Sequence, residues 1–458
     1  MKNNKIINII NEQDKFFKSG KTEDISFRID TLKKLKSSII EHEEEIFQAL
    51  YKDLKKSKFE SYATEIGIIL DELNFFIKNL KKISKNKKVK TNFINFPAKS
   101  FIHYEPYGRT LIISPWNYPF QLTIAPLIGS IAAGNTSVLK PSELSEETSK
   151  IIDKIISKTF QRNHVAVIEG GVEINKIILN ERWDFIFFTG SVNVGKIIMG
   201  SAAKHLTPVV LELGGKSPAV VTDDANLKVS AKRLVWGKLI NAGQTCIAPD
   251  YLLVQRKIKD KFIKLCIDEI KNSYGENPML SKDYVKIINP NHFKRVLDLL
   301  KGEKIIYGGK SNKTLNIIEP TIVENVSLNS SIMKEEIFGP ILPVITFDSL
   351  NEAFDIINKI PNPLASYIFT ENKKTEKQFL QNVKSGSACI NDTVVQISNP
   401  ALPFGGKNTS GIGRYHGRAS FEAFSNQKSV LKQKTLFDLP LRYPPYKNKL
   451  KMIKLILK

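Results

Sequence analysis

The chain has 458 residues, so about two or three domains are expected rather than one simple core. Its apolar fraction of 42% is ordinary for a globular protein and excludes a disordered chain. The formal net charge of +22 comes mainly from lysine, and the aromatic residues are not interleaved with arginine. Compositional drift therefore explains the charge better than nucleic-acid binding, which is not expected.

The two ends of the chain bear on its location. The N-terminal stretch MKNNKIINIINEQDKF interrupts its apolar residues with polar ones, unlike a targeting signal. Along the whole chain, no run reaches the roughly 20 apolar residues of a membrane span. The short basic stretch KNKLKMIKLILK is expected to be a solvated helix end, with peripheral contact to a membrane surface as the alternative.

The three cysteines, Cys246, Cys266 and Cys389, are widely spaced and form no Cys-x-x-Cys motif. This pattern indicates a reducing, cytoplasmic environment rather than a disulfide framework. The six histidines are scattered, so no metal site is expected.

Apolar residues recur at three- and four-residue steps in residues 1–80, which predicts packed amphipathic helices. The basic run 81–90 is expected to be solvated. The following TNFINFPAKSFIHYEP alternates loosely around two prolines, as an extended or edge strand does. The tail from Asn391, rich in glycine, proline and aromatic residues, is expected to form loops and an edge strand.

From Arg109 onward, short apolar strands alternate with helical patterns. Up to residue 208 the candidate strands are RTLIIS, NTSVLK, HVAVIEG and WDFIFFTG. A second run, 209–390, contains VVLEL, PAVVT, YLLVQ, ILPVITF and ASYIFT. This alternation predicts parallel sheets covered by helices on both faces, with ligands at the carboxyl ends of the strands.

The stretch FFTGSVNVG, residues 187–195, is a candidate dinucleotide site. An apolar strand ends in a glycine turn and a helix is expected to open at Lys196, so free helix amides would face a pyrophosphate. Gly190 would permit the close approach of the phosphates. The motif is not Gly-x-Gly-x-x-Gly, because Val192 occupies its third position, and a purely structural turn explains it equally well.

Three polar residues follow predicted strands. Asn117 lies in the rigid SPWNYP loop, which suits an amide aimed at a developing oxyanion, although an ordinary turn residue is favoured from this loop alone. Lys140 and Glu143, in LKPSE, are candidates for binding ribose hydroxyls, with solvated surface charges as the commoner case.

By its spacing alone, EEIFGP at 335–340 is typical of a helix end.

Glu212 and Cys246 are the candidate reactive pair. Glu212 ends an apolar run before a Gly-Gly turn, and Cys246 lies in GQTCIAPDY, whose polar, glycine-rich surroundings favour a reactive thiol over a merely buried one. A thiol nucleophile and a carboxylate base suit covalent acyl chemistry, provided the fold brings them together. Cys266, in a helical pattern, and Cys389, at a strand end, are expected to be structural.

Taken together, PWNYP, LKPSE, FFTGS, LELGGKSP, GQTCIAPDY, EEIFGP and PFGGKNTSG resemble, in the same order, the motifs of NAD(P)-dependent aldehyde dehydrogenases. The Glu212-to-Cys246 spacing and the terminal SGIGRYHG, FSNQKSV and RYPPY resemble the class 3 and fatty-aldehyde branch. That branch is typically dimeric and accepts medium- to long-chain aliphatic or aromatic aldehydes. The resemblance implies an α/β fold with two Rossmann-type parallel-sheet domains and a small β oligomerisation arm.

The resemblance also implies a domain plan. It assigns an NAD(P)-binding domain to 1–80 and 101–208, a catalytic domain to 209–390, bridging strands of the oligomer to 81–100 and 391–430, and a C-terminal tail to 431–458.

By this resemblance, Cys246 attacks the aldehyde to give a thiohemiacetal, hydride passes to the nicotinamide, and Glu212 is the base for water that hydrolyses the resulting thioester. Asn117 and the Cys246 backbone amide would form the oxyanion hole, and Tyr118 would line the substrate tunnel. The implied cofactor contacts are Gly190, Ser191 and Gly195 at the pyrophosphate, Lys140 and Glu143 at the adenine ribose, Glu336 at the nicotinamide ribose, and Trp116 and Phe338 nearby.

Glu212 favours a free carboxylic acid as product, because relatives that acylate coenzyme A or phosphate usually lack this residue. A thioester-forming acyl reductase on the same scaffold is the alternative. A non-enzymatic structural or membrane-binding protein is disfavoured, because Cys246, Glu212 and Asn117 are all present. The Glu143 carboxylate favours NAD, with NADP as the second cofactor. Because a free cysteine has a pKa of about 8.5, the site must stabilise the thiolate.

Overall fold

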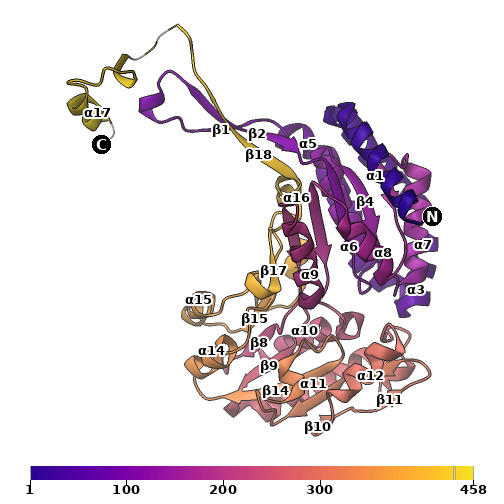
Figure 1. Cartoon of the computed structure of the whole chain (residues 1–458). Helices are drawn as coiled ribbons and strands as arrows, with labels where there is room; N and C mark the ends of the chain where they lie inside the picture. Colours follow the sequence, from indigo (N-terminus) through magenta and orange to yellow (C-terminus); the bar gives the residue numbers. More distant parts are fainter. Residues whose placement is uncertain (1, 437, 439, 457–458) are drawn as a thin grey trace.

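The computed structural model describes residues 2–436, 438 and 440–456 and has the expected α/β architecture (Figure 1). Two bodies, each built around a largely parallel sheet, lie side by side, and an antiparallel arm projects away from both. Within the described ranges, no helix combines the length and apolar character needed to cross a bilayer.

The first body is built on a six-stranded sheet. All neighbouring strands pair in parallel except β17, which is antiparallel to β7. In spatial order the strands are β17 (Gly411–Ile412), β7 (Val209–Glu212), β6 (Phe185–Thr189), β3 (Arg109–Ile113), β4 (Thr136–Lys140) and β5 (Val165–Val167).

The position of β7 corrects one expectation from the sequence. The strand VVLEL was placed in the second α/β run, but β7 pairs with β6 and completes the first sheet. Its side chains are buried or half-buried throughout, so only the pairing partner decides to which sheet the strand belongs. The consequence is that Glu212 and the glycine turn after β6 lie at the same edge of one sheet.

Helices surround the first sheet, some packed directly on its strands and others packed on those helices. They are α1 (Lys2–Lys18), α2 (Ile25–Glu41), α3 (Glu43–Leu54), α4 (Lys58–Ser61), α5 (Gly67–Ile83), α6 (Gln121–Ala133), α7 (Glu146–Thr159), α8 (Val172–Asn180) and α9 (Val192–Ala203). Every residue of α6 is buried, because this helix is apolar on all sides and other elements surround it. It ends at Gly134, whose φ of 98° is left-handed and accessible to glycine.

The second body contains a seven-stranded sheet in which only β10 is antiparallel to its neighbour. In spatial order the strands are β10 (Lys304–Tyr307), β13 (Thr321–Glu324), β14 (Ile341–Phe347), β9 (Tyr251–Gln255), β8 (Pro218–Val221), β15 (Ala365–Phe369) and β16 (Ser387–Ile390). A small separate hairpin consists of β11 (Ser311–Asn312) and β12 (Ile317–Ile318).

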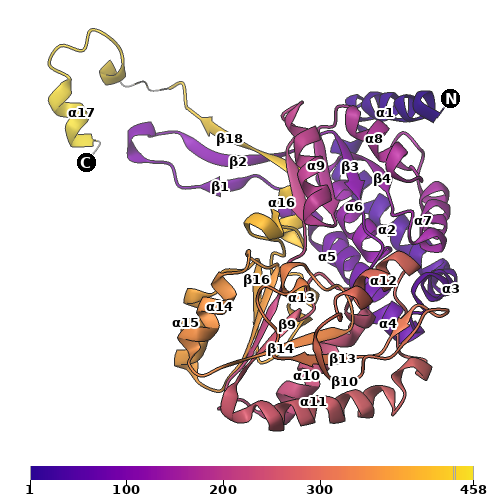
Figure 2. The same cartoon turned by 60° about the horizontal axis from the view of Figure 1, so that its bottom comes forward.

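In Figure 2, α10 (Leu227–Leu239) and α11 (Lys259–Tyr274) lie together on one side of the seven-stranded sheet, and α14 (Leu350–Asn358) and α15 (Lys373–Asn382) lie on the other. Cys266 is fully buried on α11, as its helical pattern predicted. The remaining helices of this body are α12 (Pro290–Asp298) and the short α13 (Ser331–Lys334).

The arm consists of β1 (Lys87–Val89), β2 (Lys99–Pro106) and β18 (Ser425–Lys432), in that order. All three are antiparallel, and β18 forms one edge, as expected for part of the tail. The tail also contains a helix, α16 (Arg418–Ala423), where loops were predicted. Beyond the arm, the chain ends in the exposed α17 (Leu450–Ile456) (Figure 1).

Candidate functional site

Glu212 is the last residue of β7 and is almost completely buried, with 1% of its surface exposed. Its backbone is held on both sides, because β7 pairs with β6 and β17 and the Gly190 amide donates to the Glu212 carbonyl at 3.0 Å. Within the described chain, no group hydrogen-bonds either carboxylate oxygen. Burial therefore raises the pKa of Glu212 to about 8, which suits a base that works near neutrality.

Cys246 follows a tight 3-10 turn, Ile240–Gly243, in which Asn241 and Ala242 have left-handed φ angles of 53° and 50°. The residue is half-buried and its thiol is free. Burial, and then the Glu212 and Glu336 carboxylates, raise the pKa of this thiol well above its usual value. These carboxylates therefore do not stabilise a thiolate, as the site was expected to do. The resting protein holds a neutral thiol beside a buried carboxyl.

Two cavities meet at this pair of residues. One has a volume of about 350 Å³ and mainly apolar walls, and the other has a volume of about 1040 Å³. Leu122, Glu212 and Cys246 line both cavities. A molecule in either cavity can therefore reach the sulfur, and two different molecules can meet there.

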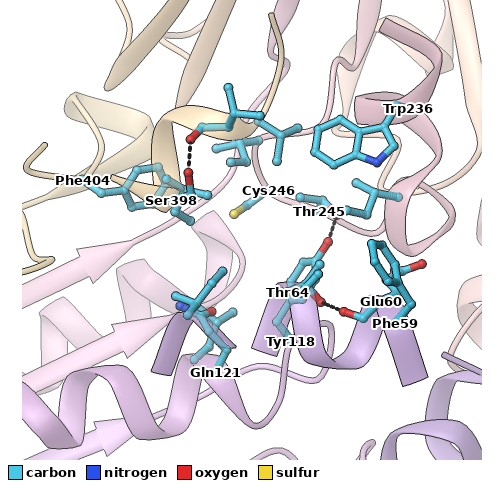
Figure 3. Close-up of a pocket in the computed structure, with 18 of the residues that line it drawn as sticks. Phe59, Glu60, Thr64, Tyr118, Gln121, Trp236, Thr245, Cys246, Ser398 and Phe404 are labelled. Atoms are coloured by element: carbon cyan, nitrogen blue, oxygen red, sulfur yellow. Dashed lines mark hydrogen bonds between the residues drawn. The ribbon is translucent and has the colours of Figure 1, made fainter. Parts of the chain in front are cut away.

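The 114–119 loop lies against the Cys246 turn. The Asn117 side-chain Nδ2 donates to the Gln244 carbonyl at 3.0 Å, and the hydroxyls of Tyr118 and Thr245 are 2.7 Å apart. Figure 3 shows Tyr118 and Thr245 joined in this way beside Cys246. Asn117 lines the larger cavity and Tyr118 the apolar one, so this loop contributes to both sides of the site.

The turn between β6 and α9 borders the larger cavity. Gly190 and Ser191 line it, and the Ser191 side chain caps α9 by accepting from the Val194 amide at 3.4 Å. The helix begins at Val192 rather than at the predicted Lys196, because this serine cap lets it start directly after the turn. The free amides of this helix end are suited to a phosphate group.

Gly195 was also expected beside the pyrophosphate, but the described lining of the larger cavity does not include it. Its amide donates within α9 to the Ser191 carbonyl, and a Cβ at this position would collide with Leu213. Gly195 therefore lets α9 pack closely on the chain segment after β7.

Glu336 and Phe338 are half-buried and line the larger cavity. Burial, and then the Asp250 carboxylate, raise the pKa of Glu336 to about 8. Its carboxylate fills the space where a Cβ on Gly214 would stand, so the glycine turn after Glu212 is shaped around it. Trp116 packs edge-on against Phe338 at 5.4 Å between ring centroids, which forms an aromatic wall.

Lys140 and Glu143 lie together, with the Lys140 Nζ 3.3 Å from a Glu143 oxygen and 2.7 Å from the Pro141 carbonyl. Lys140 is buried at the end of β4, and burial lowers its pKa. Lys140 ends its strand at the same edge of the sheet as Gly190 and Glu212, although neither it nor Glu143 is in the described lining of the larger cavity. Their contact with a ribose stays a prediction.

Two residues that the sequence patterns did not single out hold the segment that carries Glu336. The buried Lys216 Nζ contacts the Asp250 carboxylate and donates to the carbonyls of Ile332 at 2.7 Å and Glu335 at 2.9 Å. Asp250 also accepts from the Ile337 amide at 3.0 Å. Lys216 lies in the stretch LELGGKSP and Asp250 in GQTCIAPDY. A charged residue among small residues is unusual, and this pattern could have singled out both residues from the sequence.

The chain was compared with known proteins. The model of the aldehyde dehydrogenase family matches residues 1–430. The chain is 46% identical over 445 residues to 4,4'-diaponeurosporen-aldehyde dehydrogenase of Staphylococcus aureus, covering 97% of both proteins. It is 43% identical over 443 residues to the dimeric NADP-preferring aldehyde dehydrogenase of Canis lupus familiaris, covering 96% of this chain and 98% of that one.

The solved structures agree with the sequence matches. A substrate-bound state of Staphylococcus aureus AldH superposes with a TM-score of 0.97 at 45% identity, covering 99% of each chain. The family model spans nearly all of the sequence, and these relatives match it from end to end. This chain belongs to the aldehyde dehydrogenase family.

Proposed function

We propose that this enzyme oxidises medium- to long-chain aliphatic or aromatic aldehydes to free carboxylic acids, with Cys246 as nucleophile and Glu212 as the base of the hydrolytic step. One observation carries the proposal: Cys246 and Glu212 both line the junction of an apolar cavity and a larger cavity with a phosphate-compatible helix end. The apolar cavity would hold the aldehyde chain and the larger one the cofactor.

The steps follow from the positions of the side chains. The Cys246 sulfur gives its proton to water and adds to the aldehyde carbon. The former carbonyl oxygen then carries the negative charge and accepts hydrogen bonds from Asn117 Nδ2 and the Cys246 amide. NAD(P)⁺, held beside Gly190, Ser191 and Glu336, would supply the acceptor for the hydride that the adduct loses on becoming a thioester. Glu212 then takes a proton from water, whose oxygen adds to the acyl carbon and releases the acid and the thiol.

The residues around the larger cavity fit a dinucleotide. Ser191 and Gly190 present the α9 helix end to a phosphate, Glu336 can accept hydrogen bonds from ribose hydroxyls, and the Trp116–Phe338 wall can face an aromatic ring. Enzymes of this family use NAD or NADP. We assign NAD as the preferred cofactor here through Glu143, whose carboxylate would accept from a ribose 2′-hydroxyl.

The apolar walls support the substrate class. They include Phe59, Ile68, Trp236, Val395 and Phe404. Figure 3 shows Phe59, Trp236 and Phe404 around the cavity that Cys246 lines. Burial of each methylene against such walls contributes about 0.8 kcal/mol, so affinity should grow with chain length until the cavity is filled. One relative is named for its action on 4,4'-diaponeurosporen-aldehyde.

The arm supports a homodimer. Its apolar side chains Val89, Phe93, Phe96 and Leu431 are exposed by 41%, 79%, 62% and 49% in the single chain, and a second copy would cover them. A related enzyme is named as dimeric. Three free thiols fit a cytoplasmic location.

A panel of aldehydes from propanal to dodecanal, assayed by NADH and NADPH absorbance, tests the proposal. We expect kcat/KM to rise with chain length, a higher value with NAD than with NADP, and free acid as the product without added coenzyme A. A product that appears only as a coenzyme A thioester would instead identify an acyl reductase of the same fold.

A further inference from the structure

Residues 56–66 lie directly behind both loops of the site. They lead from α3 to α5 through α4 and a π-helical turn, Tyr62–Ile66. Short π-helical turns inside helical segments are uncommon and recur at functional sites. Three charged side chains of this segment, Lys56, Glu60 and Glu65, contact the loops.

Lys56 and Glu65 form an ion pair of 2.6 Å in which both side chains have 0% exposure. Removing two charges from water is costly, and apolar residues of similar volume often serve stability as well or better. Stability alone therefore does not account for a pair buried this deeply. The other contacts of the two side chains show what the pair holds in place.

Those contacts all go to the loop of Asn117. The second Glu65 oxygen accepts from the Phe120 amide at 2.9 Å and the Gln121 amide at 3.3 Å, which caps the start of α6. The Lys56 Nζ lies 3.4 Å from the Asn117 carbonyl and 4.3 Å from the centroid of the Tyr118 ring. The pair thus holds the backbone from the Asn117 carbonyl to the Gln121 amide, directly after the side chain that would donate to the oxyanion.

Glu60 extends the same support to the other loop. Its carboxylate accepts from the Asn241 amide at 2.8 Å, at the left-handed turn before Cys246. The Asn241 side chain then donates to the Asn117 carbonyl at 2.8 Å and to the Gln244 carbonyl at 3.1 Å. One short segment therefore sets the position of the Asn117 amide relative to the sulfur.

We propose that the buried Lys56–Glu65 pair positions the Asn117 oxyanion donor, so that Lys56 and Glu65 are positioning residues for the oxidation of the aldehyde. This inference rests on the proposed role of Asn117. Misplacing a catalytic group by about 1 Å can cost about 100-fold in rate, so loss of the pair should reduce kcat without any change in the reacting groups.

The test begins with Lys56→Met combined with Glu65→Leu, which removes both charges and the acceptor for the Phe120 amide. Because the apolar replacement leaves no unpaired charge, the thermal midpoint should fall only modestly, through the lost acceptor of the Phe120 and Gln121 amides. We expect kcat to fall about tenfold or more while the KM for NAD is unchanged. Lys56→Met combined with Glu65→Gln keeps the acceptor and should recover several-fold of the lost kcat.

Asn117→Ala is then introduced into the parent and into the Met/Leu background. In the parent it should cost about 10²–10³ in kcat, as the loss of one oxyanion donor does. In the Met/Leu background it should cost less than about tenfold, because the amide is already displaced. An equal loss in both backgrounds would overturn the positioning role while leaving the proposed function intact. No loss in the parent would remove Asn117 from the mechanism and the inference with it.

Two controls address fold stability. Lys154→Met with Glu45→Leu removes an exposed ion pair of 2.6 Å far from the site and should leave kcat unchanged. Leu35→Ala removes buried apolar contacts in α2 and should lower the thermal midpoint without the kcat defect. If Leu35→Ala, at equal loss of stability, lowered kcat as much as the Met/Leu variant, destabilisation would explain the effect and the inference would fail.

Discussion

The Asn117 side chain donates a 3.0 Å hydrogen bond to the carbonyl of Gln244, two positions before Cys246. This bond joins a loop of the first sheet to the turn that opens the second body. The bond therefore ties the loop of the proposed oxyanion donor to the loop of the proposed nucleophile.

 Asn117 and Gln244 lie 127 positions apart along the chain. What the bond establishes is that only tertiary contact joins these two loops.

Replacing the nucleophile gives the most direct prediction. Cys246→Ala should abolish aldehyde oxidation, because no sulfur remains to form the thiohemiacetal. NAD should still bind, since the larger cavity keeps its other walls. NADH absorbance measures the first effect, and a fluorescence titration with NADH measures the second. A Cys246→Ala enzyme with full dehydrogenase activity would show that another residue is the nucleophile.

Replacing the base should separate the two halves of the reaction. Glu212→Gln keeps the shape of the buried side chain but cannot take a proton from water, so hydrolysis of the thioester should slow by about 10²–10⁴. An acyl-enzyme should then accumulate on Cys246 and appear in the intact mass of the protein after mixing with aldehyde and NAD. Rapid turnover with no such adduct would exclude Glu212 as the hydrolytic base.

The pH dependence follows from the same carboxyl. Because burial raises the pKa of Glu212 to about 8, the ionised base is scarce at low pH and kcat should rise with pH until about 8, then level off. The folded state keeps this proton while the unfolded state, with a pKa near 4.5, has lost it. The free energy of unfolding should therefore fall as pH rises between these values. Glu212→Gln should raise the thermal midpoint more at about pH 8 than at about pH 5.

The buried Lys216–Asp250 pair, which holds the segment that carries Glu336, can be tested by its effect on cofactor binding. Asp250→Asn removes the charge partner of the buried Lys216, and breaking a buried pair typically costs about 3–5 kcal/mol. The segment that carries Glu336 should loosen, so the KM for NAD should rise at least several-fold alongside a lower thermal midpoint. An unchanged KM for NAD in a destabilised enzyme would limit the Lys216–Asp250 pair to a structural role.

The apolar cavity predicts a length-dependent defect. Val395→Trp places a bulky ring in the wall of this cavity, and kcat/KM should fall about tenfold or more for dodecanal but little for propanal. Leu402→Trp is a matched control, because Leu402 is 49% exposed and lies outside the described cavity lining. Equal losses for both aldehydes would mean that the chain of the substrate lies elsewhere.

The sequence was sufficient where the signal is local. Apolar strands and amphipathic helices follow from periodicity, and Glu212 and Cys246 stand out because an acid after an apolar run and a thiol in a polar, glycine-rich loop are unusual. The ordered motifs identified the family, which the comparisons confirm. The glycine turn at Gly190 was recognisable too, although its serine cap starts the helix earlier than the spacing suggested.

Only the tertiary structure decided which sheet receives β7, that Gly195 packs against Leu213, and that two cavities meet at Cys246. It also revealed the buried Lys56–Glu65 pair, whose members look like ordinary helix charges in the sequence. The physical reason is that burial, pairing and pKa depend on neighbours supplied by distant parts of the chain, whereas periodicity and turn chemistry are properties of a few consecutive residues.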